Sequence, residues 1–149
     1  SPWEERDKLE VDAFHVARDL GLPMFGICRG AQLLCALNEG SLWQNVSRHG
    51  LHHMIYDAGL EEMFSTSSCH HQMCRPNPEN TDIFGWAYKQ TTVFEDDTTS
   101  IESDGEFGTE PELMYHKNIN ALAVQGHPEW MAPDSGMVKW IQNFMKEKM

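Results

Sequence analysis

The chain has 149 residues, 40% hydrophobic and 23% charged, which suits one domain with an ordinary core, expected to span residues 1–149. Its formal net charge of −12 argues against nucleic acid or an anionic membrane surface as the main partner, because phosphate groups would repel it. No apolar run approaches the ~20 residues of a membrane span, and no secretory leader is recognisable. Four cysteines are too few for a disulfide scaffold, so a cytoplasmic protein with reduced thiols is expected.

The first predicted element is an amphipathic helix from Trp3 to Leu20. Apolar residues recur in it at helical spacing, and acidic residues gather near its start, where the helix dipole favours them. Gly21 is expected to end the helix. The residues expected to face the core are Leu9, Ala13, Val16, Ala17 and Leu20.

A short buried strand is predicted at Met24–Ile27, followed by a helix from Cys28 to Asn38. The succession of helix, strand and helix is typical of a layered α/β domain with a largely parallel sheet.

The middle of the chain has weaker patterns. Residues 41–46 are expected to form a short turn, and residues 65–82, rich in polar residues and proline, a loop around a brief helical or turn element. Strands are predicted at 83–89, 91–96, 112–117 and 120–126, with a solvated acidic hairpin or mobile loop from Glu95 to Glu112. A closing helix should begin near Asp134 or Ser135 and bury Met137, Trp140, Ile141 and Phe144.

The stretch Gly26-Ile27-Cys28-Arg29-Gly30 lies at the predicted change from strand to helix and has the form of a nucleophile elbow. In such an elbow, small flanking residues let the backbone turn sharply and expose the central side chain. A cysteine in the first turn of a helix is close to backbone N–H groups and to the positive end of the dipole, which favour the thiolate. The N–H of Arg29 would point to where an oxyanion forms during acyl transfer. A packed cysteine is the alternative.

A cysteine nucleophile needs a base, and the base usually needs a third group to orient it. His127 directly follows the strand predicted at 120–126, at the sheet edge where ligand sites of α/β proteins lie. Glu129 comes next but one, across Pro128, whose fixed φ stiffens the turn. The alternative is a surface His-Pro-Glu turn without a catalytic role.

Together, GICRGAQLL (26–34) and VQGHPEW (124–130) resemble the nucleophile and His-x-Glu signatures of the class I glutamine amidotransferase-like family. Further stretches are similar to its γ-glutamyl-γ-aminobutyrate hydrolase branch, for which Arg29 after the cysteine is typical. These stretches are RDKLEVDAFHVARDLGLP (6–23), EGSLWQNV (39–46) and CHHQM (69–73), so the resemblance covers nearly the whole chain.

The resemblance implies a flavodoxin-like three-layer α/β fold with a mainly parallel sheet, and a triad of Cys28, His127 and Glu129. Cys28 would attack the γ-carbonyl of glutamine or of a γ-glutamyl amide and form a γ-glutamyl thioester. His127, oriented by Glu129, would protonate the leaving amine and then activate water. The pocket for the glutamyl group would be formed by Gln32, His70, His71 and Gln72. No cofactor is implied.

The family's domain normally begins several strands earlier, with a Gly-Gly turn that donates the second oxyanion N–H, and this chain contains no Gly-Gly pair. The sheet is therefore expected to lack its first strands. Three explanations are open: the chain is a fragment of a longer protein, a partner supplies the missing edge, or this is a shortened homologue with weak or lost catalysis.

Other hypotheses compete with a free-standing hydrolase. Zinc is one, since thiolate and imidazole are its preferred ligands and candidates crowd the middle of the chain: His49, His52, His53, Cys69, His70, His71 and Cys74. The spacing from Cys69 to Cys74 matches no common zinc finger, so no metal site is predicted. A non-enzymatic binding or regulatory module is another. The third is an ammonia-donating glutaminase subunit that works with a synthase partner. Self-association is also compatible with an exposed sheet edge.

Overall fold

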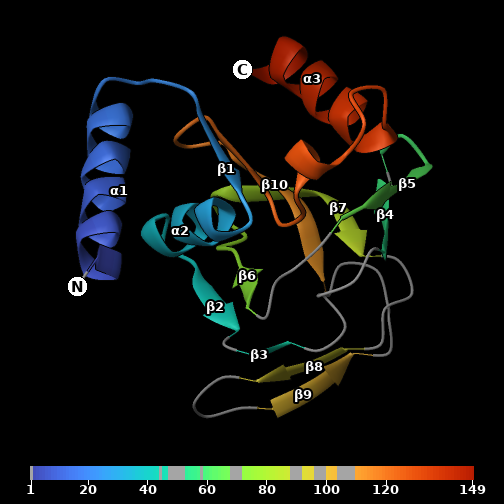
Figure 1. The fold of residues 1–149 in the computed structure, drawn as a ribbon, viewed down its shortest axis with the longest axis horizontal. Helices are drawn as coiled ribbons and strands as arrows, with labels where there is room; N and C mark the ends of the chain where they lie inside the picture. The colour runs from blue at the N-terminus through green and yellow to red at the C-terminus, as the bar shows by residue number, and fades with distance from the viewer. Residues whose placement is uncertain are drawn as a thin grey trace.

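The computed structural model describes residues 2–43, 45–46, 53–57, 59–67, 72–87, 92–95, 100–103 and 110–149. Within these residues the elements follow one another as shown in Figure 1: α1 (Pro2–Asp19), β1 (Met24–Ile27), α2 (Arg29–Leu37), β2 (Ser41–Trp43), β3 (Asn45–Val46), β4 (His53–Asp57), β5 (Glu62–Thr66), β6 (Met73–Arg75), β7 (Thr81–Ala87), β8 (Thr92–Glu95), β9 (Ser100–Ser103), β10 (Pro111–His116), β11 (Ala121–Val124), the 3-10 helix η1 (Pro128–Trp130) and α3 (Gly136–Lys148).

The largest sheet has the strand order β1-β11-β10-β7-β4-β5. Among its described strands only β1 and β11 pair in parallel, and the other neighbours are antiparallel. The α/β class is confirmed, but the prediction of a mainly parallel sheet is wrong. The physical reason lies in the connections: short turns join β10 to β11 and β4 to β5, and a short turn can join only antiparallel neighbours.

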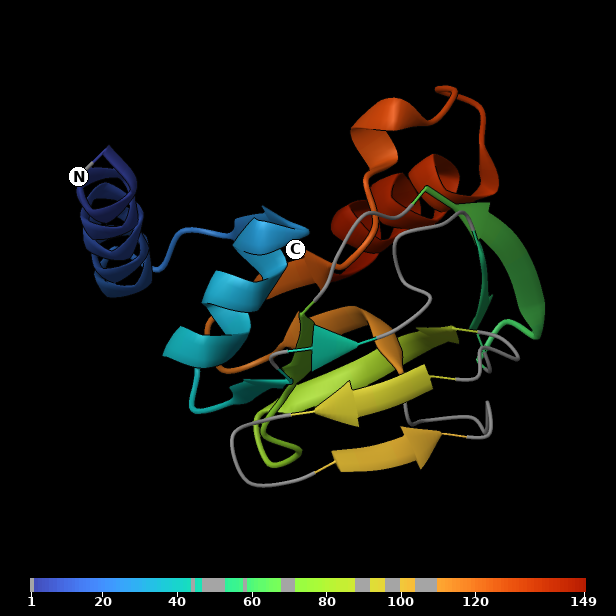
Figure 2. The same cartoon turned by 60° about the horizontal axis from the view of Figure 1, so that its bottom comes forward.

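Two smaller antiparallel sheets contain β2 with β6, and β3 with β8 and β9 (Figure 2). Strands therefore occur where the sequence predicted a turn, at 41–46. In the loop predicted at 65–82, β6 takes the place of the expected helical or turn element, and β5 and β7 extend into its two ends. In the acidic stretch, β9 pairs antiparallel with β8, in agreement with the predicted hairpin, but Glu110 and Glu112 are fully buried rather than solvated. The strands predicted at 83–89, 91–96, 112–117 and 120–126 are confirmed as β7, β8, β10 and β11.

The core lies on both faces of the sheet, as the alternation along β11 shows. Leu122 and Val124 belong to a buried cluster with Met137, Ile141 and other residues of α3. Ala121 and Ala123 belong to a second cluster, with Ala31, Leu34 and Cys35 of α2. Because successive side chains of a strand point to opposite faces, α2 and α3 cover opposite sides of the sheet. This is the predicted layered arrangement.

The predicted first helix is confirmed, and its C-terminus forms a Schellman motif. Gly21, at φ 67°, donates its N–H to the Arg18 carbonyl, and Leu22 donates to the Ala17 carbonyl. The predicted core face is wrong, however: Leu9 and Leu20 are each 69% exposed, whereas Phe14 is buried against the α2 cluster. Figures 1 and 2 show α1 at one side of the molecule. Periodicity reveals an apolar face but not whether another element covers it.

The closing helix follows its prediction. The Ser135 hydroxyl accepts a hydrogen bond from the Val138 N–H at 3.3 Å, and Met137, Trp140, Ile141 and Phe144 are buried. No helix in the described ranges is long and apolar enough to cross a membrane.

Candidate active site at the ends of β1 and β11

Cys28 forms a sharp turn between β1 and α2. Its backbone has φ 51° and ψ −103°, a strained conformation for a residue with a side chain. The turn is tied down on both sides, because the Cys28 N–H donates to the Val124 carbonyl at 2.8 Å and its carbonyl accepts from the Gln32 N–H at 3.0 Å. The predicted strand-turn-helix context of the elbow is therefore present.

Gly26 and Gly30, the two glycines that flank the elbow, have different structural roles. A Cβ on Gly26 would lie 2.6 Å from the Gly30 carbonyl oxygen, so Gly26 lets α2 pack directly on β1. A Cβ on Gly30 would meet no atom within 4 Å. Neither glycine has a positive φ; Cys28 makes the turn itself. Gly30 thus leaves open space beside the first turn of α2.

Cys28 differs from the other described cysteines in its exposure: Cys35 and Cys74 are buried, and Cys28 is half-buried. Burial raises the pKa of the Cys74 thiol well above its usual value, and a hydrogen bond with Cys74 lowers the pKa of Cys35. These two thiols belong to the packed core under α2. Cys28 is therefore the described cysteine best placed to meet a substrate.

Arg29 directs its guanidinium group to α1, where it pairs with Asp7 and Glu10. Burial acts to raise the pKa of Glu10, but hydrogen bonds from Arg6 and Arg29 outweigh it and lower this pKa below its usual value. These ion pairs connect α1 to the residue that follows Cys28. Arg29 is the first residue of α2. Its backbone N–H was predicted to donate to an oxyanion from this position.

His127 lies near the same sheet edge as Cys28, because β1 and β11 run in parallel with Ile27 opposite Val124. Its Nδ1 is 2.6 Å from Oε1 of Glu129, as expected from the His-x-Glu spacing. Trp130 stacks on the imidazole, with ring centroids 3.7 Å apart and planes 10° from parallel. The side chain of His127 keeps 16% of its surface exposed. The imidazole is thus oriented by a carboxylate and an indole while remaining accessible.

Gln125 is a site residue that the sequence reasoning missed. Its fully buried side chain accepts from the Cys74 N–H at 3.1 Å and donates from Nε2 to the Cys28 carbonyl at 3.5 Å. Its own N–H donates to the Glu112 carbonyl at 3.0 Å. The sequence offers one indication of its role, because Gln125 is a polar residue directly after the apolar residues of β11. Gln125 links the strand before His127 to the cysteine elbow.

Two of the predicted substrate-binding residues lie within the described ranges. Gln32 is 8% exposed, and its Nε2 donates to the Gln72 carbonyl at 3.1 Å. His70 and His71 lie outside the described residues, as do His49, His52 and Cys69 of the zinc hypothesis. Within the described part of the chain, no group of three or more His, Cys, Asp or Glu side chains is arranged to hold a metal ion.

A buried His–Glu pair, also unpredicted, lies near this site. His53 Nε2 is 2.6 Å from Oε1 of Glu112, and both side chains are almost completely buried. The Glu112 carbonyl also accepts a hydrogen bond from the N–H of Gln125, directly after β11. The pair therefore helps to hold the end of β11 in place. We assign it a structural role, since a buried charge requires a partner of this kind.

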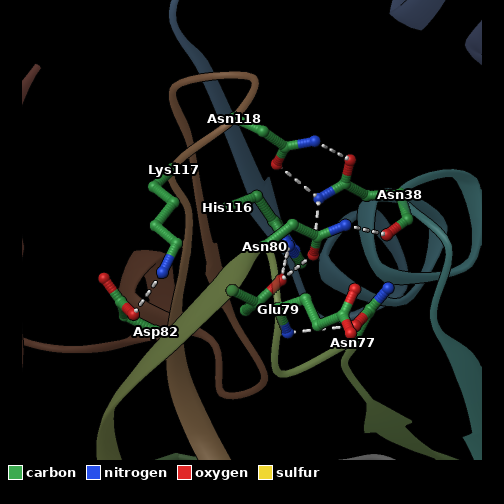
Figure 3. Close-up of polar contacts among 9 residues, drawn as sticks. Asn38, Asn77, Glu79, Asn80, Asp82, His116, Lys117 and Asn118 are labelled. Atoms are coloured by element: carbon green, nitrogen blue, oxygen red, sulfur yellow. Dashed lines mark hydrogen bonds and ion pairs between the residues drawn. The ribbon is translucent and has the colours of Figure 1, made fainter.

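The C-terminal end of α2 carries a separate polar network (Figure 3). Asn38 and Asn118 each donate their amide N–H to the other's Oδ1 at 2.9 Å, and Asn80 Nδ2 donates to the Asn38 carbonyl at 3.1 Å. These contacts tie α2 to the turns before β7 and after β10, at the helix end opposite Cys28.

His116 extends this network into the core (Figure 3). The Thr81 hydroxyl donates to Asn80 Oδ1 at 2.8 Å and accepts from His116 Nδ1 at 2.7 Å, which fixes the proton on Nδ1. Nε2 of His116 is buried without a hydrogen-bond partner among the described residues. Burial lowers the pKa of His116 to about 4, so the imidazole is neutral at pH 7.

The sequence model of the family described as glutamine amidotransferase class-I matches residues 2–147. The chain is similar to the carbamoyl phosphate synthase small chain of Clostridium acetobutylicum, with 31% identity over 72% of this chain and 26% of that protein. The small chain of Photobacterium profundum is 28% identical over 80% of this chain and 27% of that protein. The chain thus spans about a quarter of the length of these curated relatives.

Solved structures show the same fold at low identity. A glutamine amidotransferase from Thermotoga maritima has a TM-score of 0.59 and 16% identity, over 94% of this chain and 54% of that one. A putative GMP synthase subunit from Thermoplasma acidophilum has a TM-score of 0.56 and 17% identity, over 95% of this chain and 71% of that one. The family of the sequence prediction is confirmed, and the branch within it stays a prediction.

Proposed function

Because the chain belongs to the class I glutamine amidotransferase family, we propose that it cleaves the γ-carboxamide of glutamine through a γ-glutamyl thioester on Cys28. One observation carries the proposal: the strained elbow of Cys28 and the His127–Glu129 pair follow two parallel neighbouring strands at the same sheet edge. A nucleophile, a base and an orienting carboxylate are the groups that acyl transfer requires.

In the proposed first step, the Cys28 thiolate attacks the γ-carbonyl carbon. His127 gives a proton to the amide nitrogen, the C–N bond breaks, and ammonia leaves while the glutamyl group stays on sulfur. In the second step, His127 takes a proton from water, whose oxygen attacks the thioester carbon. The C–S bond breaks, and glutamate and the Cys28 thiolate result.

Glu129 would act through His127. With Nδ1 donating to the carboxylate, Nε2 carries the lone pair that these proton transfers need. Glu129 also stabilises the imidazolium that forms when His127 takes a proton, and the stacked Trp130 adds a cation–π contribution.

The N-terminus of α2 would stabilise the tetrahedral intermediate. We assign the Arg29 N–H as oxyanion donor, since Arg29 is the first helical residue after the nucleophile and the helix dipole adds positive potential there. The ion pairs of the Arg29 side chain with α1 hold this residue in place.

For the glutamyl group we propose Gln32 and residues 70–72 as the binding surface. The Gln32 amide nitrogen is engaged by the Gln72 carbonyl, which fixes the side chain one helical turn beyond Cys28. His70 and His71, which lie outside the described residues, enter this proposal on the family resemblance alone.

The released ammonia suggests a synthase partner. The relatives named above are a small chain of carbamoyl phosphate synthase and a putative subunit of GMP synthase, which are by name parts of larger synthases. By analogy, we propose that this chain supplies ammonia to a synthase.

A second candidate is a hydrolase of γ-glutamyl amides with a larger leaving amine. Trp130 favours it, because its indole stacks on His127 and is still 60% exposed. An exposed aromatic surface beside the proton donor is suited to contact an organic amine as it leaves. Relative kcat/KM values for glutamine and for γ-glutamyl-p-nitroanilide distinguish the two candidates.

The first experiment is labelling with a glutamine analogue that carries an electrophilic diazoketone in place of the amide. Intact mass and peptide mass are measured on the full chain and on Cys28→Ala. The proposal expects one adduct, on Cys28, that excess glutamine prevents. Cys35 and Cys74 serve as internal controls, because both thiols are buried.

Glutaminase activity is measured alongside, by ammonia release. Cys28→Ala is expected to lower it by at least about 10³-fold, as for other nucleophile deletions. Equal labelling of several cysteines, or activity that survives Cys28→Ala, would overturn the proposal.

A further inference from the structure

The contacts that orient the His127 ring are local. Glu129 and Trp130 lie within three residues of His127 and share the short helix η1 with its flanking turn. Because they lie in the same turn as His127, they orient the imidazole but do not by themselves fix its distance from Cys28. The end of β11 and the Gln125 bond to Cys28 anchor the strand before this turn, and a contact from a distant part of the chain can hold the turn itself.

Ser67, directly after β5, makes that contact. Its hydroxyl donates to the His127 carbonyl at 2.7 Å, and its own carbonyl accepts the His127 N–H at 3.0 Å. Ser67 is 1% exposed, so water does not compete for these bonds. We propose that Ser67 is a positioning residue, which fixes the backbone of the general base relative to the nucleophile.

Gly126 makes this contact possible. A Cβ at this position would lie 2.0 Å from Thr66 Oγ1 and 2.7 Å from the Ser67 carbonyl oxygen. The end of β5 and the residue before His127 are therefore in direct backbone contact, with no room for a side chain. Such close packing leaves the two segments little freedom to shift relative to each other.

Gln72, the next described residue after Ser67, contacts the nucleophile helix. The Gln72 carbonyl accepts a hydrogen bond from the Gln32 side-chain amide of α2 at 3.1 Å. Ser67 therefore contacts the His127 turn, and Gln72, five positions later in the sequence, contacts the helix that follows Cys28. The two contacts thus involve both halves of the site, the His127 turn and the helix that follows Cys28.

The inference rests on the proposed function in one respect, the pairing of Cys28 with His127. A base displaced by about 1 Å can cost ~10²-fold in rate, even when every catalytic residue is present. Loss of the Ser67 hydroxyl leaves its backbone bond in place, so a smaller effect is expected. Ser67→Ala should lower kcat about 10-fold and change KM less than 2-fold.

The test compares Ser67→Ala with the matched control Ser65→Ala, which removes the same hydroxyl from an exposed position of β5. Besides kcat and KM, the pH dependence of Cys28 alkylation by iodoacetamide is followed by peptide mass. Pairing with the His127 imidazolium lowers the pKa of a cysteine thiol, so a displaced His127 raises the apparent pKa toward the free value of ~8.5. His127→Ala defines the full shift.

Expected are a partial shift for Ser67→Ala, none for Ser65→Ala, and recovery in Ser67→Thr, which keeps the hydroxyl. Ser67→Ala with the alkylation profile of the parent chain would overturn the inference, as would a profile that His127→Ala leaves unchanged. Near-UV circular dichroism checks that each variant is folded. Alkylation needs no substrate, so a chain without glutaminase activity but with the Ser67 effect would refute the proposed function and support this inference.

Discussion

The Nδ1 atom of His127 lies 2.6 Å from Oε1 of Glu129, in a turn that leaves 46% of the Glu129 side chain exposed. The carboxylate can only accept, so Nδ1 is the donor and Nε2 is the basic nitrogen. Solvent screens a half-exposed pair, which limits what its charge contributes to stability. Its main effect is to select one tautomer and orientation of the imidazole.

Glu129→Gln tests this relationship. The amide can present its NH₂ group to Nδ1 and favour the wrong tautomer, so kcat for glutamine hydrolysis should fall by about 10²-fold or more, with little change in KM. Steady-state ammonia release measures both constants. Glu147→Gln, on the exposed face of α3, is the control and should behave as the parent chain. An unchanged kcat in Glu129→Gln would show that His127 needs no orienting carboxylate.

Gln125→Met should reduce both stability and activity. The substitution keeps the length of the side chain but removes the acceptor for the buried Cys74 N–H and the donor to the Cys28 carbonyl. An unsatisfied buried donor costs about 1–3 kcal/mol, which urea unfolding measures. Gln142→Met, on the exposed surface of α3, controls for residue type and should leave the unfolding midpoint unchanged. Equal midpoints for the two variants would contradict the bridging role of Gln125.

Gly126→Ala should destabilise the fold by about 1–3 kcal/mol or more, because its Cβ would overlap with Thr66 Oγ1 and the Ser67 carbonyl. Gly30→Ala is the matched control. It adds a methyl group to open space in α2, where alanine is favoured over glycine by about 1 kcal/mol. Thermal unfolding should therefore move in opposite directions for the two variants. Similar shifts in both would mean that the β5 contact tolerates a side chain.

The stability of the chain should fall with acid through His116. The folded pKa of His116 is about 4, below the value of 6.5 for a free imidazole, so the unfolded chain binds the proton first as pH falls. The contribution of neutral His116 to the free energy of unfolding is fully present above pH 6.5. It is lost as the pH falls from 6.5 to 4, and the loss amounts to about 3 kcal/mol.

Urea unfolding at pH 7 and at pH 4 measures this loss in the parent chain and in His116→Gln. The variant is expected to be less stable at pH 7, because it lacks the hydrogen bond between His116 Nδ1 and the Thr81 hydroxyl. It is also expected to lose less stability on acidification, because glutamine does not take up a proton. Equal losses in both proteins would show that another group governs the acid transition.

Local sequence patterns predicted the parts of the site that depend on near neighbours. The G-x-C-x-G stretch and the His-x-Glu spacing each lie within a few residues, so they led to Cys28, His127 and Glu129. Gln125 and Ser67 carry no such pattern. Their partners are Cys28, Cys74 and His127, in distant segments, and only the folded chain brings these groups within hydrogen-bonding distance.

By itself, the sequence determined the three α-helices, the strands β1, β7, β8, β10 and β11, and the family, because periodicity and motifs are local properties of the chain. Tertiary structure decided which strands become neighbours and in which direction, since β7 pairs antiparallel with β10 and with β4, neither of which is joined to it by a short turn. It also decided which apolar face is covered: Phe14 of α1 reaches the core, and Leu9 and Leu20 do not. Burial depends on what packs against a residue, and that partner is set by the whole fold.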